Sequence, residues 1–251
     1  MPAVVNFVGG GGKTGLILKL LDEFVESTSP IYTTTTRMHP PDPGHGLAIL
    51  SGDNMKLLKE VLNKIAGSCH NSHTKFVVAN LPIPDSHNLI GGIPTDFVHG
   101  INRKYFSMIF NEADGARSMS LKMPRAGEPV LLEEATCLVP VIGMDCLMKP
   151  LGPETLFRWE MAAERFSLKA GQTITPRLAA DLLLHKEGVC SGFKGGMSIV
   201  PFVNKVDEES QDSLARELAL ALLRNEHFPV SKVVWGSIIN RRVASLSAVA
   251  Q

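Results

Sequence analysis

Residues 4–14 read VVNFVGGGGKT, an apolar segment followed by four glycines and then by Lys13 and Thr14. Glycines let backbone N–H groups turn towards phosphate oxygens, and the N-terminus of a following helix adds partial positive charge. Phe7 stands where the motif G-x-x-x-x-G-K-[ST] has its first glycine. The order of strand, glycine-rich loop and helix nevertheless predicts a phosphate-binding loop.

The residues of this loop have distinct expected roles in binding a nucleoside triphosphate. Lys13 would reach the β- and γ-phosphates, and the Thr14 hydroxyl would ligate Mg²⁺. The residues expected to contact the nucleotide here are Gly9, Gly10, Gly11, Gly12, Lys13 and Thr14. The alternative is a glycine-rich turn that happens to precede a lysine.

The composition restricts the class of protein. The chain has 251 residues and a formal net charge of zero, so it lacks the basic excess typical of nucleic-acid-binding proteins. We expect no secretory signal, because a strand begins almost at once without a basic region and a long apolar region before it. We expect no membrane span, because no apolar run has the required length. The four cysteines form no C-x-x-C pair, as is typical of reduced thiols in a cytoplasmic protein. Cys69, His70 and His73 lack a second ligand pair, which argues against a metal site there.

Short apolar runs alternate with longer helical patterns, which indicates parallel βαβ units. The expected strands are residues 4–8, 31–34, 75–80, 106–111, 135–142, 197–203 and 231–234. The expected helices are residues 14–26, 54–66, 153–168, 176–184 and 209–223, with Thr175 as N-cap and Pro176 at the first helical position. We therefore predict an α/β protein with the three-layer P-loop NTPase fold and a mostly parallel central sheet. We expect one continuous domain, with residues 149–195 as a helical insertion or lid.

A second motif, SMIFNEADG at residues 107–115, places Glu112 and Asp114 just past an apolar run. In phosphate-loop NTPases a second strand ends in an acidic residue that holds Mg²⁺. Either carboxylate could be the metal ligand, and the other could position a water or the substrate. Acidic residues at a strand end are also common without such a role.

A third motif, Asn204-Lys205-Val206-Asp207, follows the expected strand 197–203. The carboxylate of Asp207 can accept hydrogen bonds from guanine N1–H and its 2-amino group, a pair that adenine lacks, so it indicates GTP. The Lys205 stem can lie along the base, and Asn204 can tie neighbouring loops together. Residues 233–237 could supply backbone N–H groups to the base. As a bare string, N-K-x-D can also be an ordinary turn.

Two further segments have two readings each. The threonines at 33–36 could face Mg²⁺ or the γ-phosphate, or could simply reflect the β propensity of threonine. Arg117, Lys122 and Arg125 follow the acidic motif and could hold an anionic substrate or neutralise a transferred phosphoryl group. They could also form a plain basic loop. Arg158 and Glu160 are interpreted as an exposed salt-bridge face.

The ordered motifs FVGGGGKT, TTTTRM, NEADGARSMSLKMPRAGEPV and NKVD resemble those of the selenium-dependent hydroxylase accessory proteins, the YqeC-like family. The resemblance covers nearly the whole chain. It implies a P-loop nucleotide-binding protein that assists maturation of selenium-dependent molybdenum hydroxylases, with the hydroxylase, its cofactor or a selenium donor as a partner. The residues that match the shared motifs are Lys13, Thr14, Glu112, Asp114, Lys122, Glu128, Asn204 and Asp207.

Three functions remain open from the sequence. The first is a maturation factor that hydrolyses GTP or ATP with Mg²⁺. The second is a small-molecule kinase or nucleotidyltransferase acting on a cofactor or selenium species. The third is a nucleotide-binding chaperone with little turnover that grips its client with residues 149–195. The expected catalytic residues are Lys13, Glu112, Asp114, Arg117 and Lys122.

Overall fold

A computed structural model describes residues 3–26, 29–68, 74–84, 86, 88–102 and 104–248. The described residues form two compact units, each assembled from separate parts of the chain. The first unit draws on Met1–Phe7, Thr14–Gly115 and Val130–Thr136, and the second on Val8–Lys13, Ala116–Pro129 and Cys137–Gln251. The single continuous domain expected from the sequence stays a prediction.

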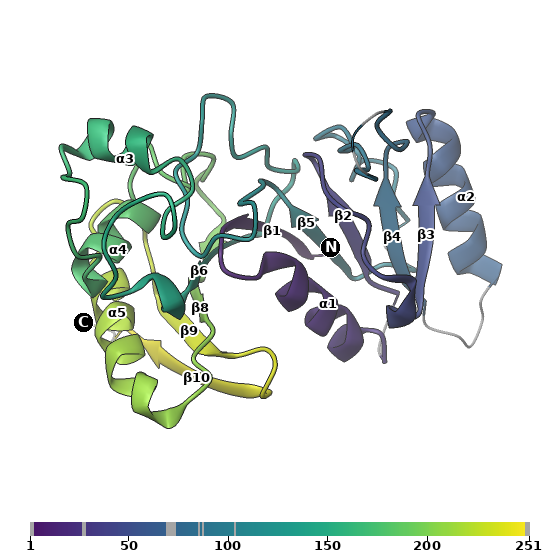
Figure 1. Cartoon of the computed structure of the whole chain (residues 1–251). Coiled ribbons are helices and arrows are strands. Elements are labelled where there is room, and N and C mark those ends of the chain that lie inside the picture. Colours follow the sequence, from purple (N-terminus) through teal and green to yellow (C-terminus); the bar gives the residue numbers. More distant parts are fainter. Residues whose placement is uncertain are drawn as a thin grey trace. The chain divides into compact units, whose positions relative to one another are not determined.

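The first unit contains a parallel sheet (Figure 1). Its strands, in spatial order, are β1 (Ala3–Gly9), β5 (Met108–Glu112), β2 (Ile31–Thr34), β4 (Lys75–Ala79) and β3 (Leu47–Ser51). The strands β1, β2 and β4 are almost entirely buried, as apolar strands covered on both faces should be.

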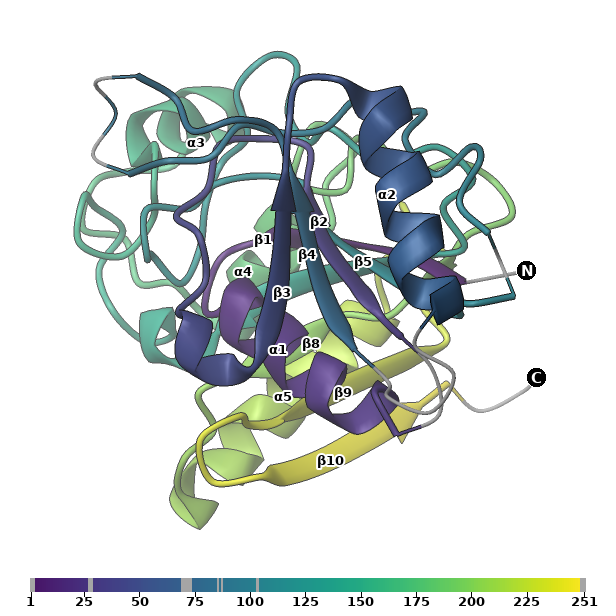
Figure 2. The same ribbon diagram turned by 90° about the vertical axis from the view of Figure 1, so that its right-hand side faces the viewer.

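Two helices cover opposite faces of this sheet (Figure 2): α1 (Lys13–Phe24) and α2 (Met55–Ser68). On one face, Leu62 of α2 packs into a buried cluster with Ile109 of β5. On the other, the rings of Phe24 and Phe110 lie 5.8 Å apart between centroids. Because Ile109 and Phe110 are neighbours on one strand, their side chains point to opposite faces. The first unit therefore has three layers.

The second unit contains a mixed sheet. Its strands are β6 (Cys137–Gly143), β7 (Ser198–Ile199), β8 (Phe202–Asn204), β9 (Lys232–Ser237) and β10 (Arg242–Ser247). β7 and β8 both pair parallel with β6, β9 pairs parallel with β8, and β10 pairs antiparallel with β9. The strand expected at 197–203 is thus split in two at Pro201, which has no N–H to donate to a ladder.

Three α-helices belong to the second unit: α3 (Trp159–Phe166), α4 (Pro176–Leu183) and α5 (Asp212–Leu223). The described residues also form the short 3₁₀ helices η1 (Pro43–His45), η2 (Met144–Cys146) and η3 (Glu209–Gln211). α4 packs against α5, which packs on β9 and β10. Thr175 caps α4 by accepting a hydrogen bond from Leu178 N at 3.2 Å, and Pro176 is the first helical residue, which confirms the predicted start.

The structure also differs from the expected elements at α3, β3 and β10. α3 begins at Trp159 rather than at residue 153, because Arg158 has a left-handed φ of 63° and the preceding turn is closed by the Thr155 hydroxyl. The strands β3 and β10 were not expected from the sequence.

Cys69, His70 and His73 lie outside the described residues. Within the described ranges, no helix is both long and apolar enough to cross a membrane.

Candidate functional site

The glycine loop between β1 and α1 is packed so tightly that side chains are excluded. Gly11 has a φ of 83°, and a Cβ built on it would lie 2.1 Å from Gly143 N. Gly12 has a φ of 111°, and its Cβ would lie 2.6 Å from Asn204 Nδ2. Both positions combine a left-handed backbone with a close neighbour, so the glycine run is a steric requirement of this fold.

Two N–H groups of the loop are hydrogen-bonded within the protein. Gly10 N donates to Val141 O at 3.0 Å, and Gly11 N donates to Met119 O at 2.9 Å. We expected such groups to face phosphate oxygens. In this conformation they instead fasten the loop to β6 and to the segment 119–120, because buried backbone donors need a partner.

Lys13 reaches back over its own loop. Its side chain is buried, and Nζ donates to Gly9 O at 2.5 Å. Burial of an ammonium is costly unless it is hydrogen-bonded or paired with an opposite charge. The contact places a lysine charge at the carbonyl side of the loop, next to the N-terminus of α1.

Asn204, the last residue of β8, ties the loop to two other segments. Its Nδ2 donates to Gly11 O at 2.7 Å, and its Oδ1 accepts from Ile238 N at 3.4 Å. The side chain is almost fully buried. This is the connecting role expected of the asparagine in N-K-V-D.

Lys205 contacts two residues beside the loop. Its Nζ donates to Asp145 Oδ2 at 2.8 Å and to Ser120 Oγ at 2.7 Å. Partial burial raises the pKa of Asp145, but the hydrogen bonds from Lys205 and Ser120 outweigh it and hold the pKa below its usual value. The carboxylate is therefore ionised and paired with Lys205.

Asp207 is exposed and held through its backbone. Its N–H donates to Gln211 Oε1 at 2.7 Å, and Asn240 Nδ2 donates to its carbonyl oxygen at 3.1 Å. Among the described residues, none pairs with its carboxylate. The carboxylate is thus available to a ligand.

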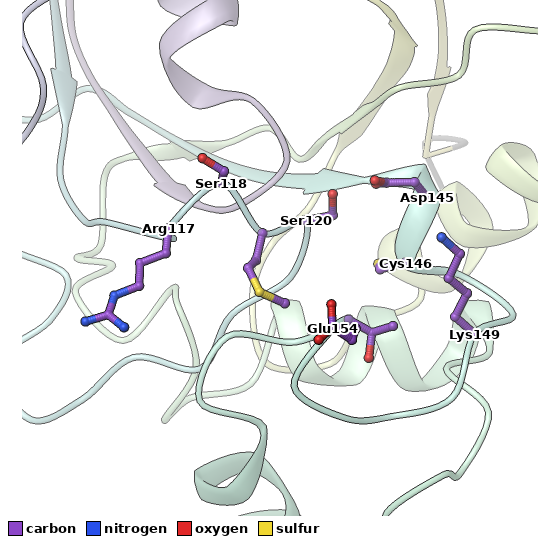
Figure 3. Close-up of a pocket in the computed structure, with 9 residues that line it drawn as sticks. Arg117, Ser118, Ser120, Asp145, Cys146, Lys149 and Glu154 are labelled. Atoms are coloured by element: carbon purple, nitrogen blue, oxygen red, sulfur yellow. The ribbon is translucent and has the colours of Figure 1, made fainter.

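A pocket of about 270 Å³ lies beside the loop (Figure 3). It is lined by Arg117, Ser118, Met119, Ser120, Asp145, Cys146, Lys149, Glu154 and Thr155. Arg117 and Lys149 lie at opposite ends of the set of side chains drawn in Figure 3. Met119, whose carbonyl accepts the Gly11 N–H, makes the pocket wall continuous with the loop.

Lys122 belongs to a buried ionic cluster. Its Nζ lies 2.8 Å from Glu128 Oε2, and Arg158 contacts both oxygens of that carboxylate, at 2.8 and 3.1 Å. Arg125 Nε lies 2.9 Å from Glu128 Oε1. Burial raises the pKa of Glu128, but hydrogen bonds from Arg158 and Lys122 prevail and lower it to about 2.

This cluster changes two interpretations. Arg158 is partly buried and forms a bidentate pair with Glu128, so its interpretation as part of an exposed salt-bridge face with Glu160 is wrong. The sequence could not reveal this pair, because 30 positions separate the two residues. Lys122 and Arg125 face a carboxylate of the chain itself, so of the three expected anion-binding cations it is Arg117 that lines the pocket.

In the first unit, the hydroxyl and the carboxylate expected to share Mg²⁺ lie together. Thr14 Oγ1 donates to Glu112 Oε2 at 2.9 Å. The Tyr32 hydroxyl donates to the same oxygen at 2.8 Å, a partner that the sequence analysis missed. Burial, followed by the charge of Glu112, raises the pKa of Tyr32 well above its ordinary value. Asp114 is fully buried, two residues beyond Glu112.

The oxygen donors of Thr14 and Glu112 suit Mg²⁺, which needs only one or two protein carboxylates when phosphates and waters complete its shell. Within the described ranges, no group of three or more His, Cys, Asp or Glu residues could hold a metal ion. A Mg²⁺ site here would therefore depend on the phosphates of a nucleotide.

The threonines at 33–36 mostly bind the backbone of neighbouring segments. Thr33 Oγ1 donates to Val78 O at 2.6 Å and Thr34 Oγ1 to Glu112 O at 2.9 Å. Thr35 Oγ1 donates to Val130 O. These hydroxyls connect β2 to the segments beside it, which accounts for them without a ligand.

The family model described as "YqeC protein" matches residues 5–160, more than half of the chain. The chain belongs to the YqeC family. The "Uncharacterized protein YqeC" of Escherichia coli K12 is 26% identical over 208 residues, which cover 82% of this chain and 77% of that protein. No solved structure matches the chain. The YqeC match includes the glycine loop, the acidic motif and every residue that lines the pocket, and it ends before N-K-V-D.

Proposed function

We propose that this YqeC-family protein binds a nucleoside triphosphate together with Mg²⁺, and that guanine is the preferred base. The observation that carries the proposal is the hydrogen bond from Asn204 Nδ2 to Gly11 O. It joins the N-K-V-D motif directly to the glycine loop within one compact unit. One nucleotide would contact both segments, with its phosphates at the loop and its base at Asp207.

The phosphates would be bound by the loop and the helix N-terminus that follows it. Lys13 would exchange its contact with Gly9 O for phosphate oxygens, a stronger, charge-assisted interaction. Thr14 is the next residue in the chain, and with Glu112 it offers the oxygen ligands for Mg²⁺. When bound, Mg²⁺ would neutralise charge on the β- and γ-phosphate oxygens. Asp114 is proposed to support this metal site.

The base would be read by Asp207. Its carboxylate can accept from both guanine N1–H and the 2-amino group, whereas adenine would leave it without a donor pair. GTP is therefore expected to bind more tightly than ATP. Lys205 would help to hold the N-K-V-D segment in place through its hydrogen bonds to Asp145 and Ser120.

The proposed biological role is maturation of a selenium-dependent molybdenum hydroxylase, with nucleotide hydrolysis resetting a loop of the protein. Support for this role comes from the resemblance of the ordered motifs and from membership of the YqeC family. A second candidate function is group transfer from the nucleotide to a small molecule. The pocket beside the loop supports it, because a small acceptor molecule could bind there.

Equilibrium binding of GTP, ATP and CTP, with and without Mg²⁺, tests the proposal. We expect Mg²⁺-dependent binding of GTP, with ATP at least tenfold weaker, or about 1.4 kcal/mol. Preference for ATP or CTP would retain the phosphate loop but refute the role of Asp207. Absence of binding by all three nucleotides would refute the proposed function.

A further inference from the structure

We propose that the pocket beside the glycine loop binds a small molecule that carries a phosphate or carboxylate group, held between Arg117 and Lys149. The inference rests on the proposed nucleotide site, because it assigns the second substrate of that site. In this proposal Lys149 joins Arg117 as an anion-binding residue in place of Lys122 and Arg125, because the latter two already contact Glu128.

The position of the pocket supports this assignment. Met119 accepts the Gly11 N–H at 2.9 Å, and the next residue, Ser120, accepts the Gly143 N–H through its carbonyl at 2.9 Å. Both residues also line the pocket. A ligand in the pocket would therefore lie against the same backbone segment that fastens the glycine loop.

The charges of the lining residues favour an anion. Asp145 is paired with Lys205 at 2.8 Å, so its charge is already neutralised. Burial raises the pKa of Cys146 to about 12, so the thiol stays neutral. The remaining charged side chains are two cations, Arg117 and Lys149, and one carboxylate, Glu154. The lining therefore carries an excess of one positive charge.

Arg117 is further restrained by an aromatic ring. Its guanidinium carbon lies 5.2 Å from the centroid of Phe157, and the guanidinium of Arg158 lies 4.6 Å from the same ring. A guanidinium held over a ring loses less freedom when it binds a planar or tetrahedral oxyanion. The side chain is also exposed, so a ligand can reach it.

The backbone around the pocket is unusual for residues other than glycine. Arg117 and Ser118 have φ values of 48° and 62°, and Met148, just before Lys149, has a φ of 59°. Left-handed conformations of such residues are uncommon and concentrate at active sites and ligand-binding sites. Here they occur next to both cations of the pocket. Its volume of about 270 Å³ suits a small metabolite.

Isothermal titration with inorganic phosphate, and in parallel with malonate at equal ionic strength, tests the inference. The full chain is first saturated with Mg²⁺ and a non-hydrolysable GTP analogue, so that the glycine loop is occupied. We expect the wild type to bind one or both anions, and the Lys149→Ala variant to bind about tenfold more weakly. Lys186→Ala, which removes an exposed lysine from outside the pocket, is the matched control and should bind like the wild type.

A second variant separates this inference from the proposed function. Lys13→Ala, titrated with the anion in the absence of nucleotide, should still bind the anion although it has lost the nucleotide. Lys149→Ala should lose the anion but still bind the nucleotide. Equal anion binding by the wild type and Lys149→Ala, or no binding of either anion to the wild type, would overturn the pocket assignment. Anion binding that depends on Lys149 in a chain that binds no nucleotide would support the pocket and refute the proposed function.

Discussion

The side-chain amide of Asn204 donates to the carbonyl oxygen of Gly11 at 2.7 Å, although 193 positions separate the two residues in the chain. The same amide nitrogen lies 2.6 Å from the place that a Cβ of Gly12 would occupy. One side chain therefore fixes how closely the end of β8 approaches the glycine loop. It also makes a larger residue at Gly12 incompatible with that approach.

Replacing Asn204 with Asp should weaken GTP and ATP binding by a similar factor. The substitution turns a donor into an acceptor that faces the Gly11 carbonyl, and an unsatisfied buried carbonyl costs about 1–3 kcal/mol. The free energy of unfolding in urea should fall by that order, and nucleotide titrations should show equal losses for both bases. A change confined to GTP would mean that Asn204 reads the base.

Replacing Lys13 with Ala should weaken the binding of GTP much more than that of guanosine, because in the proposed complex the ammonium contacts the phosphates and not the nucleoside. Calorimetric titration of both ligands measures the difference. Lys19→Ala on the same helix is the control, since Lys19 is paired loosely with Glu23 at 3.8 Å. Equal losses for nucleotide and nucleoside would show that the loop does not bind phosphate.

Replacing Asp207 with Asn should exchange guanine for xanthine specificity. The 2-carbonyl of xanthine needs a donor where guanine needs an acceptor, and the asparagine amide supplies one. Competition between GTP and xanthosine triphosphate measures the switch, with a reversal of at least tenfold, or about 1.4 kcal/mol. An unchanged base preference would refute base recognition by Asp207 and would mean that N-K-V-D is an ordinary turn.

Replacing Gly11 with Ala should destabilise the protein, whereas Gly15→Ala should not. A Cβ at Gly11 would meet Gly143 N at 2.1 Å on a left-handed backbone, while Gly15 lies in α1 with nothing within 4 Å of its Cβ position. We expect Gly15→Ala to stabilise by about 0.5–1 kcal/mol through helix propensity. Urea unfolding of the two variants checks the contrast, and equal effects would contradict the packing of the loop.

Replacing Glu128 with Gln should destabilise the protein by about 3 kcal/mol at neutral pH, because the buried Lys122 ammonium and the Arg158 guanidinium lose their carboxylate. The pKa of Glu128 is lowered from 4.5 to about 2, so its contribution is complete above pH 4.5 and is lost as the pH falls towards 2.

Unfolding free energies measured from pH 7 to pH 3 should therefore fall less steeply in Glu128→Gln than in the wild type. Glu164→Gln, at an exposed position of α3, is the control and should follow the wild type. Identical slopes for wild type and Glu128→Gln would show that the cluster does not stabilise the folded state.

The elements that sequence predicted best are the buried ones. The strand at 31–34 was placed to the residue, and β1 and β4 to within a residue or two, because apolar runs mark strands buried on both faces. β10 was missed because it is an edge strand whose side chains are mostly exposed, and its apolar residues form no continuous run. β3 was missed for a similar reason, because it pairs with one neighbour, β4, and its residues are only partly buried or exposed.

The sequence predicted which residues belong to the candidate site, but not most of the contacts that they make. Thr14 and Glu112 were expected to act together, and they are hydrogen-bonded. Motif reading could not show that Gly10 and Gly11 donate to carbonyls of residues more than 100 positions away. It also could not show which carboxylate Lys122 faces, since ion pairs across a fold depend on tertiary packing rather than local pattern.

The order of synthesis determines when the contacts of the glycine loop can form. Its residues leave the ribosome more than 100 residues before its partners Met119, Val141 and Asn204. A nascent chain that stops short of Asn204 therefore carries the whole loop sequence without its closing contact. The loop can therefore close only after Asn204 has been synthesised, and truncations that remove Asn204 should open it while leaving every residue of the loop in place.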